Sequence, residues 1–175
     1  MPEGFTIRLA KEGDEEGIAV LRHEREGGEY DELLAQSKTL VREGLDIETT
    51  HVFIAEIPGL IIGFCIMRYF IPGDDAPVNT APGGWYLLGI NVKKEYRRRG
   101  VGTELIRVRL KFIPGTCDTA YYFTNPKNFT SQAFHSRFGF EEIKEDIVYP
   151  KRKPTTIYYR IDLDELRKRN FEIQN

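Results

Sequence analysis

The chain contains only two cysteines, Cys65 and Cys117, and their spacing matches no short metal-ligand motif. A disulfide framework, a zinc site and a cysteine nucleophile are therefore not expected, and the thiols fit a reducing compartment. The sequence also lacks an apolar run long enough to cross a membrane, and its N-terminus lacks the basic and apolar regions of a signal peptide. We expect a cytoplasmic protein that needs neither a membrane nor a metal ion.

Neither sign of charge is in excess. Twenty-five Lys and Arg residues against 27 Asp and Glu residues give a formal net charge of −2, so no global field favours nucleic acid. Hydrophobic residues make up 41% of the chain and aromatic residues 12%, which is typical of a globular fold rather than of disorder. The length of 175 residues suits one domain with a substantial core, so we predict a single domain over residues 1–175.

The hydrophobic pattern and the turn residues predict a mixed α/β fold. Asp14 is the expected N-cap of the first helix, and Gly27 and Gly44 are the expected ends of the first two helices. The expected strands cover residues 5–9, 51–56, 60–70, 85–92, 120–124, 140–149 and 156–163, with a linker over 150–154. The expected helices cover residues 14–26, 30–43, 101–112 and 128–138. This order has too few βαβ units for a doubly wound sheet.

The segment Arg97–Thr103 is the most informative part of the chain. It joins a predicted strand to a predicted helix, and Gly100 and Gly102 allow the backbone to approach a ligand closely. The first N–H groups of a helix lack internal partners and carry the positive end of the helix dipole, so they stabilise an anion. A dinucleotide loop is excluded because residue 105 is leucine instead of glycine, and no Gly-Lys-Ser/Thr sequence follows. We expect a phosphate-bearing ligand here, the simpler alternative being a tight turn beside a solvated charge cluster.

The sequence of residues 92–102, in which Arg97 is followed by Gly100 and Gly102, resembles the acetyl-CoA motif of the GNAT superfamily of N-acetyltransferases. A second segment resembles the other recurring motif of that family, an Asn with a small residue three positions on, an aromatic residue seven on and Gly-Phe shortly after. The corresponding residues here are Asn128, Ser131, His135, Gly139 and Phe140. The resemblance implies an α+β fold in which a central mixed, mostly antiparallel sheet of about seven strands is flanked by four helices.

The resemblance also implies how acetyl-CoA, the expected cosubstrate, is bound. Backbone amides from Arg97 to Thr103 would bind the pyrophosphate, and the strand edge at Ile90–Val92 would pair with the pantetheine arm. Arg97 holds a position that the family gives to Gln or Arg, whereas Arg98 and Arg99 either screen the phosphates or face water. The residues expected to bind the cosubstrate are Ile90, Asn91, Val92, Arg97, Arg98, Arg99, Gly100, Val101, Gly102, Thr103, Asn128 and Ser131.

The catalytic residues depart from the family pattern. His135 stands where many members have a tyrosine near the thioester sulfur, and a protonated imidazole can serve as the general acid. The alternatives are that His135 only packs locally and that Tyr121 or Tyr122 replaces it. Tyr86 falls where some relatives have a glutamate base, but a phenol with a reference pKa of about 10 is a poor base at neutral pH. A carboxylate among residues 24–32 could relay a proton instead, or the amine could arrive neutral.

The resemblance predicts an enzyme that transfers an acetyl group from acetyl-CoA to a primary amine by direct attack in a ternary complex. In this family the two helices after the first strand and the loop between the third and fourth strands wall the acceptor site. Here those segments contain the acidic stretch Glu24–Glu32 and the pair Asp74–Asp75. Carboxylates there would concentrate a small cationic amine, such as a polyamine, an aminoglycoside or a lysine side chain, although a charge run is more simply a solvated face.

Two other functions fit the same residues. One is acetylation of a protein N-terminus or lysine, which the long acidic loop Pro72–Gly84 disfavours because it would obstruct a flat peptide groove. The other is a non-catalytic module that binds acyl-CoA, an alternative that the missing tyrosine and glutamate leave open. The apolar strand over residues 156–161 could supply a homodimer surface or complete the sheet of the monomer. The acceptor, the base, the acyl-chain preference and the oligomeric state do not follow from the sequence.

Overall fold

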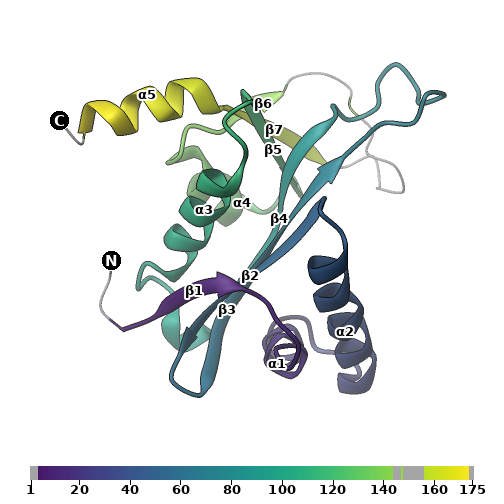
Figure 1. Ribbon diagram of the computed structural model, residues 1–175, viewed down its shortest axis with the longest axis vertical. Coiled ribbons are helices and arrows are strands. Elements are labelled where there is room, and N and C mark those ends of the chain that lie inside the picture. The colour runs from purple at the N-terminus through teal and green to yellow at the C-terminus, as the bar shows by residue number, and fades with distance from the viewer. Residues whose placement is uncertain (1–3, 144–146, 148–155, 174–175) are drawn as a thin grey trace. The chain divides into compact units, whose positions relative to one another are not determined.

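The computed structural model describes residues 4–143, 147 and 156–173, and Figure 1 shows the course of the chain. Its strands are β1 (Thr6–Leu9), β2 (Thr50–Ile57), β3 (Leu60–Phe70), β4 (Gly84–Val92), β5 (Thr119–Thr124), β6 (Glu141–Ile143) and β7 (Ile157–Asp162). Its helices are α1 (Glu15–Glu26), α2 (Tyr30–Asp46), α3 (Val101–Phe112), α4 (Phe129–Ser136) and α5 (Leu163–Ile173), with a short 3-10 turn η1 (Lys94–Tyr96) before α3. The mixed α/β class and the order of the predicted elements are confirmed.

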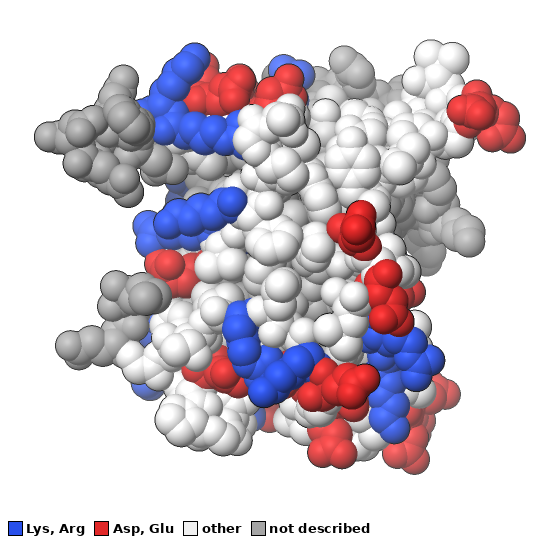
Figure 2. Space-filling view, in the orientation of Figure 1, with Lys and Arg blue, Asp and Glu red and all other residues white. Residues whose placement is uncertain are grey.

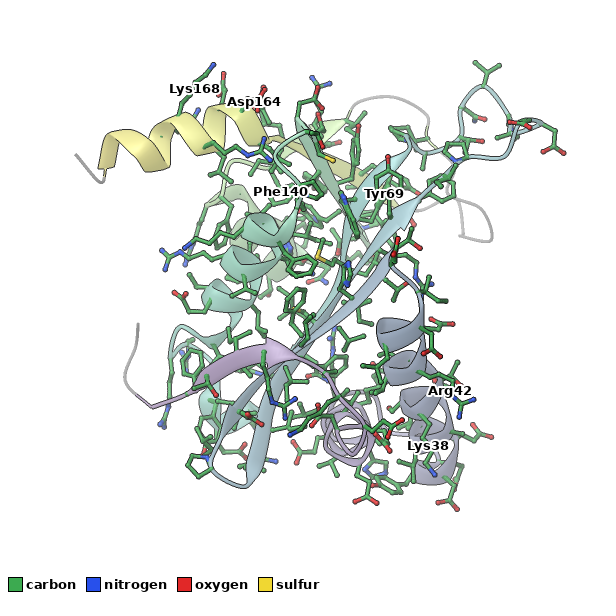
Figure 3. The ribbon with its side chains drawn as sticks, viewed as in Figure 1. Lys38, Arg42, Tyr69, Phe140, Asp164 and Lys168 are labelled. Carbon is green, nitrogen blue, oxygen red and sulfur yellow. The ribbon has the colours of Figure 1, made fainter. Side chains whose placement is uncertain are left out.

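The expected number of four helices is wrong, because α5 follows β7 directly. The Asp162 carboxylate accepts a hydrogen bond from the Glu165 N–H at 2.8 Å, and Asp164 and Glu165 complement the helix dipole in the first turn. The strand-like pattern that runs up to Leu163 conceals this start signal in the sequence. In Figure 3, Asp164 and Lys168 lie one turn apart along the same side of α5.

Three local expectations also need correction. The helix expected to stop at Gly44 continues to Asp46, because Gly44 is a close-packing glycine whose Cβ would lie 3.0 Å from a methyl of Val52. Asp14 precedes α1 but makes no side-chain cap, since its carboxylate accepts from the Lys11 N–H at 2.7 Å and from Arg8. The strand expected over residues 140–149 is seen at 141–143; residues 144–146, 148 and 149 and the linker 150–154 lie outside the described residues.

The strands form one sheet of seven in the order β1-β2-β3-β4-β5-β7-β6. Pairing is parallel between β4 and β5 and antiparallel between β1 and β2, β2 and β3, β5 and β7, and β6 and β7. The expected mixed, mostly antiparallel sheet is therefore confirmed. Because β7 pairs on both of its edges, the strand considered for a homodimer surface completes the sheet of its own chain.

The chain divides into two compact units, residues 1–68 with 88–112 and residues 69–87 with 113–175. In the first unit, α1 and α2 lie on one side of strands β1 to β3 and α3 lies on the other (Figure 1). Its core contains the buried side chains Ala10, Ile18, Leu21, Val41, Val52, Ile54 and Phe64. The single domain expected from the chain length stays a prediction.

Aromatic rings dominate the packing of the second unit. The ring of Tyr122 on β5 stacks on His135 at a centroid distance of 3.8 Å and on Tyr159 at 4.6 Å, and Phe140 meets it edge-on at 5.0 Å. The Tyr122 hydroxyl is buried and has no hydrogen-bond partner among the described residues, and burial raises its pKa. This stack joins α4 to the sheet strands β5 and β7.

Within the described residues, no helix is both long and apolar enough to span a bilayer. The same part of the chain contains no group of three or more His, Cys, Asp or Glu side chains arranged to hold a metal ion.

Candidate functional site

The turn between β4 and α3 has an unusual backbone. Arg98 has a φ of 61°, and among the described residues it is the one non-glycine residue with a positive φ. Gly100 follows with a φ of 85°, so the chain enters the left-handed region twice within three residues. A side chain as large as arginine in that conformation is held by its surroundings, and such strain is concentrated at ligand sites.

The turn leaves several amides at the start of α3 available to a ligand. The first i to i−4 hydrogen bond of the helix runs from the Glu104 N–H to the Gly100 carbonyl at 3.0 Å. The N–H groups of Val101, Gly102 and Thr103 precede that bond, so they have no carbonyl partner within the helix and carry its positive dipole end. This arrangement suits a phosphate group, as the sequence predicted.

The three arginines of the turn are exposed but not equivalent. The Arg97 Nε donates to the Val92 carbonyl at 2.9 Å and so ties the turn to the end of β4. The Arg99 guanidinium lies 5.6 Å from the centre of the Tyr96 ring, which is within the range of a cation–π contact. Arg97 therefore has a structural contact in addition to its predicted contact with phosphate.

The last part of β4 is held in place from α1. The Asn91 amide donates to the Leu21 carbonyl at 2.8 Å, and the Arg25 Nη1 donates to the Ile90 carbonyl at 2.8 Å. Gly89 has a φ of 29°, and a Cβ added there would meet no atom within 4 Å, so the strand backbone is open on that side. No local sequence pattern indicates this contact, because Arg25 and Ile90 are 65 positions apart.

A buried arginine lies against the same strand. Arg109 of α3 is fully buried, and its Nη1 donates to the carbonyls of Ile66 and Leu88, each at 3.0 Å. Its Nη2 has no hydrogen-bond partner among the described residues, and burial lowers the pKa of the guanidinium. The apolar residues Val101, Leu105, Val108 and Phe112 would share one face of an ideal helix, but Phe112 is 41% exposed and Arg109 is buried.

A groove of about 450 Å³ opens between α1 and α2 over β3 and β4. Its floor is apolar, while charged side chains form its rim. It is lined by Arg22, Arg25, Glu26, Gln36, Thr39, Leu40, Glu43, Phe64, Ile66, Gly89 and Asn91. It reaches the strand segment expected to receive the pantetheine arm, so an acceptor bound in it would lie against that strand.

The charges around the groove are mixed rather than acidic. Figure 2 shows acidic and basic side chains interleaved over α1 and α2. Of the carboxylates considered as a base in residues 24–32, Glu24 pairs with Lys93 and Glu26 is the one that lines the groove. On α2, Lys38 and Arg42 lie one turn apart on the outer side of the helix, away from the sheet (Figure 3).

The second motif lies along α4 in the second unit. The Asn128 side chain accepts from the Ser131 N–H at 3.1 Å and caps the helix. The Nδ1 of the buried His135 lies 2.8 Å from the Ser131 carbonyl and 3.3 Å from its hydroxyl. Because a carbonyl only accepts, Nδ1 carries a proton here. The structure therefore brings Asn128, Ser131 and His135 together at α4, within the second unit.

Tyr86, the weak candidate for the base, also belongs to the second unit. It is fully buried, its hydroxyl donates to the Pro82 carbonyl at 2.8 Å, and its ring stacks on Tyr121 at 5.1 Å. A phenol that already donates its proton to a carbonyl is poorly placed to accept one. The geometry thus gives Tyr86 a packing contact and offers no support for its role as a base.

Residues 19–140 match the acetyltransferase (GNAT) family. Aminoglycoside N-acetyltransferase AAC(6')-Iy, solved in complex with CoA, is 30% identical over 87% of this chain and 99% of its own, with a TM-score of 0.64. The yncA protein of Salmonella typhimurium, solved with its cofactor acetyl-CoA, is 17% identical over 93% and 96% of the two chains, with a TM-score of 0.63. A GNAT-family protein from Desulfovibrio desulfuricans is 15% identical over 91% and 99%, with a TM-score of 0.66. No curated protein sequence is significantly similar to the chain.

Proposed function

The chain belongs to the acetyltransferase (GNAT) family, and we propose that it transfers the acetyl group of acetyl-CoA to the primary amine of a small cationic metabolite. The observation that carries this proposal is the turn at Arg98–Gly100, whose positive φ values present the free amides of α3 to an anion. The amine attacks directly in a ternary complex. A carbon–nitrogen bond forms as the carbon–sulfur bond breaks, the amine loses a proton and the departing thiolate gains one.

The proposed acetyl-CoA-binding site has two parts in the first unit. The N–H groups of Val101, Gly102 and Thr103 bind the pyrophosphate, with Arg97 to Arg99 contributing positive charge around it. The strand edge at Ile90–Val92 accepts the pantetheine arm as an added strand. Asn128 and Ser131, which the second motif also predicts to bind acetyl-CoA, lie in the second unit, where the Asn128 side chain is already engaged as the cap of α4.

His135 is the proposed general acid. Its Nδ1 proton is directed to the Ser131 carbonyl, so the other ring nitrogen must carry the proton that is given to the thiolate. That requires the imidazolium form of a ring that stacks on Tyr122 at a centroid distance of 3.8 Å. No base is proposed from Tyr86, and Glu26 is the carboxylate of the groove that remains a candidate.

The groove between α1 and α2 is the proposed acceptor site, and its size suits a small molecule. The similar AAC(6')-Iy is an aminoglycoside N-acetyltransferase, which supports a cationic amine as the acceptor. Acetylation of a protein N-terminus or lysine, and acyl-CoA binding without turnover, are the competing functions. Thiol release measured with small amines, with a peptide and without acceptor distinguishes the three.

The proposed binding of acetyl-CoA is tested with Gly102→Glu. A carboxylate in the first turn is compatible with the helix dipole, so the fold is retained, but it repels the pyrophosphate and fills the space beside the backbone. We expect calorimetry to show loss of acetyl-CoA binding. Gly115→Glu is the matched control, because a Cβ at Gly115 meets no atom within 4 Å. Unchanged affinity of Gly102→Glu for acetyl-CoA refutes the assignment.

A further inference from the structure

The charged side chains around the acceptor groove are paired, with one exception. Arg22 lies 3.8 Å from Glu26, and Glu43 lies 2.5 Å from Arg68. Arg25 lines the same groove but has no carboxylate within ion-pair distance among the residues that the structure describes. The groove therefore carries one guanidinium whose charge no described side chain balances.

That guanidinium is fixed at the end of the groove nearest to β4. The Arg25 Nη1 donates to the Ile90 carbonyl at 2.8 Å, which uses one of its N–H groups and leaves the others to a ligand. Gly89 and Asn91, the neighbours of Ile90, line the same end, and the missing side chain of Gly89 keeps it open. The unpaired charge thus lies beside the strand that is proposed to hold the acyl arm.

The floor of the groove has a different chemistry. Leu40, Phe64 and Ile66 line it, and all three belong to or pack against the apolar core of the first unit. Such a surface favours an apolar group on the acceptor, because burying it removes apolar area from water. The Arg25 guanidinium, at the end of the groove nearest to β4, and the apolar floor set two separate requirements for the acceptor.

We propose that the acceptor is an amine with a carboxylate next to its amino group and an apolar side chain, as in an apolar α-amino acid. The carboxylate binds Arg25 through charge-assisted hydrogen bonds, and the side chain lies on Leu40, Phe64 and Ile66. This inference rests on the proposed acetyltransferase function, but it replaces the cationic acceptor by a zwitterionic one, because the groove carboxylates Glu26 and Glu43 are already paired with arginines. An acceptor without the carboxylate places a second positive charge beside an unpaired guanidinium, which is unfavourable.

Three amines that share one side chain test the carboxylate directly: L-leucine, L-leucinamide and isopentylamine. Thiol release is measured at saturating acetyl-CoA and over a range of pH, because the amines ionise differently. We expect kcat/KM for leucine to exceed that for the other two by about tenfold to a hundredfold, the range for a hydrogen bond to a charged group. Equal use of leucinamide or isopentylamine overturns the inference.

Arg25→Met tests whether this side chain binds the carboxylate of the acceptor. The substitution keeps an unbranched apolar stem and removes the guanidinium, so the preference for leucine over leucinamide should disappear, while Arg25→Lys should restore part of it. Arg42→Met is the matched control, since Arg42 lies on the outer side of α2 (Figure 3). Thermal melting and acetyl-CoA calorimetry on each variant exclude a loss of fold or of the cosubstrate grip. A preference for leucine that persists in Arg25→Met overturns the inference.

The experiment separates the failure of this inference from the failure of the proposed function. Turnover of polyamines or aminoglycosides, with none for amines that carry a carboxylate, overturns the inference and supports the acetyltransferase function. Tight acetyl-CoA binding without thiol release on any amine contradicts the proposed function itself, and the inference with it.

Discussion

At the residue scale, the glycine turn could be predicted from the sequence and the buried arginine could not. Gly100 is informative by itself, because its positive φ is a backbone conformation that glycine adopts most easily. Arg109 looks like a solvated helix residue, and only its partners, the Ile66 and Leu88 carbonyls on two other strands, show otherwise. A local pattern does not contain contacts of that kind.

His135 provides a test at this scale. His135→Phe keeps an aromatic ring for the stack on Tyr122 and removes the ionisable nitrogen, so we expect kcat to fall by about a hundredfold, as for loss of a general acid. The affinity for acetyl-CoA should not change. The fall of kcat toward high pH, where the acid of the native enzyme loses its proton, should also vanish from the profile.

Tyr122→Phe is the companion variant. The Tyr122 hydroxyl is buried without a partner in the part of the chain that the structure describes, and burial raises its pKa. It is therefore a weak acid, and its removal should leave kcat close to that of the native enzyme. Unchanged turnover of His135→Phe removes His135 from the mechanism. A loss of turnover in Tyr122→Phe instead transfers the role to Tyr122.

At the scale of elements, the order of the strands and of the first four helices followed from the sequence, but the fifth helix and the reasons for several boundaries did not. Asp14 has the residue type of a helix cap, yet its carboxylate joins Arg8 at 2.6 Å. Arg8 also binds Glu56 on β2 at 2.8 Å, so a single guanidinium connects β1, β2 and the start of α1. Glu56 is 48 positions from Arg8, a distance that no local signal spans.

This cluster makes stability depend on pH. Burial by itself raises the pKa of the Asp14 carboxyl, but hydrogen bonds from Arg8 and the Lys11 N–H outweigh it, and the net pKa lies below its usual value. The hydrogen bond from Arg8 likewise lowers the pKa of Glu56. Carboxyls with a lowered pKa in the folded state stabilise it above their unfolded pKa, about 4, and lose that contribution as the pH falls through the folded value.

Arg8→Met should therefore reduce the free energy of unfolding by about 1–3 kcal/mol at pH 7, with a smaller reduction below about pH 4. Urea denaturation at several pH values measures the difference. Arg169→Met is the control, because the pair of Arg169 with Glu165 is exposed on both sides and should contribute less than about 1 kcal/mol. A loss of stability in Arg8→Met that is the same at all pH values contradicts this account.

At the scale of the whole molecule, the sequence was sufficient for the family and the sheet but not for the acceptor groove. The two motifs are local, so each can be read without knowledge of the fold. The groove is lined by side chains from α1, α2, β3 and β4, and Arg25, its one unpaired charge among the described residues, is recognised only when the partners of every neighbouring charge are known. The acidic stretch Glu24–Glu32 predicts a cationic acceptor only if Arg25, the one arginine within it, is ignored.

Binding of acetyl-CoA should stabilise the whole chain by mass action. At about 100 times the dissociation constant the gain is about 2.7 kcal/mol, which corresponds to a rise in Tm of about 5–10 °C for a chain of this size. CoA should give a similar rise, because the proposed grip is on the pyrophosphate and the pantetheine arm. NADH, which has a pyrophosphate but no such arm, should give none, and neither ligand should affect Gly102→Glu. An equal rise with NADH contradicts the proposed recognition of coenzyme A.

The positive φ of Arg98 has a consequence for how this turn can evolve. The left-handed conformation is easiest for Gly, Asn and Asp and hardest for β-branched residues, so the backbone narrows the replacements that a population can carry there. Any arginine codon becomes a glycine codon when its first base changes to G, so the conformationally easiest replacement needs a single base change. That change would relax the backbone and remove a positive charge at the same time. Homologues that bind their acyl donor weakly should therefore keep the arginine at this position. Homologues that bind it tightly through other residues can carry glycine there.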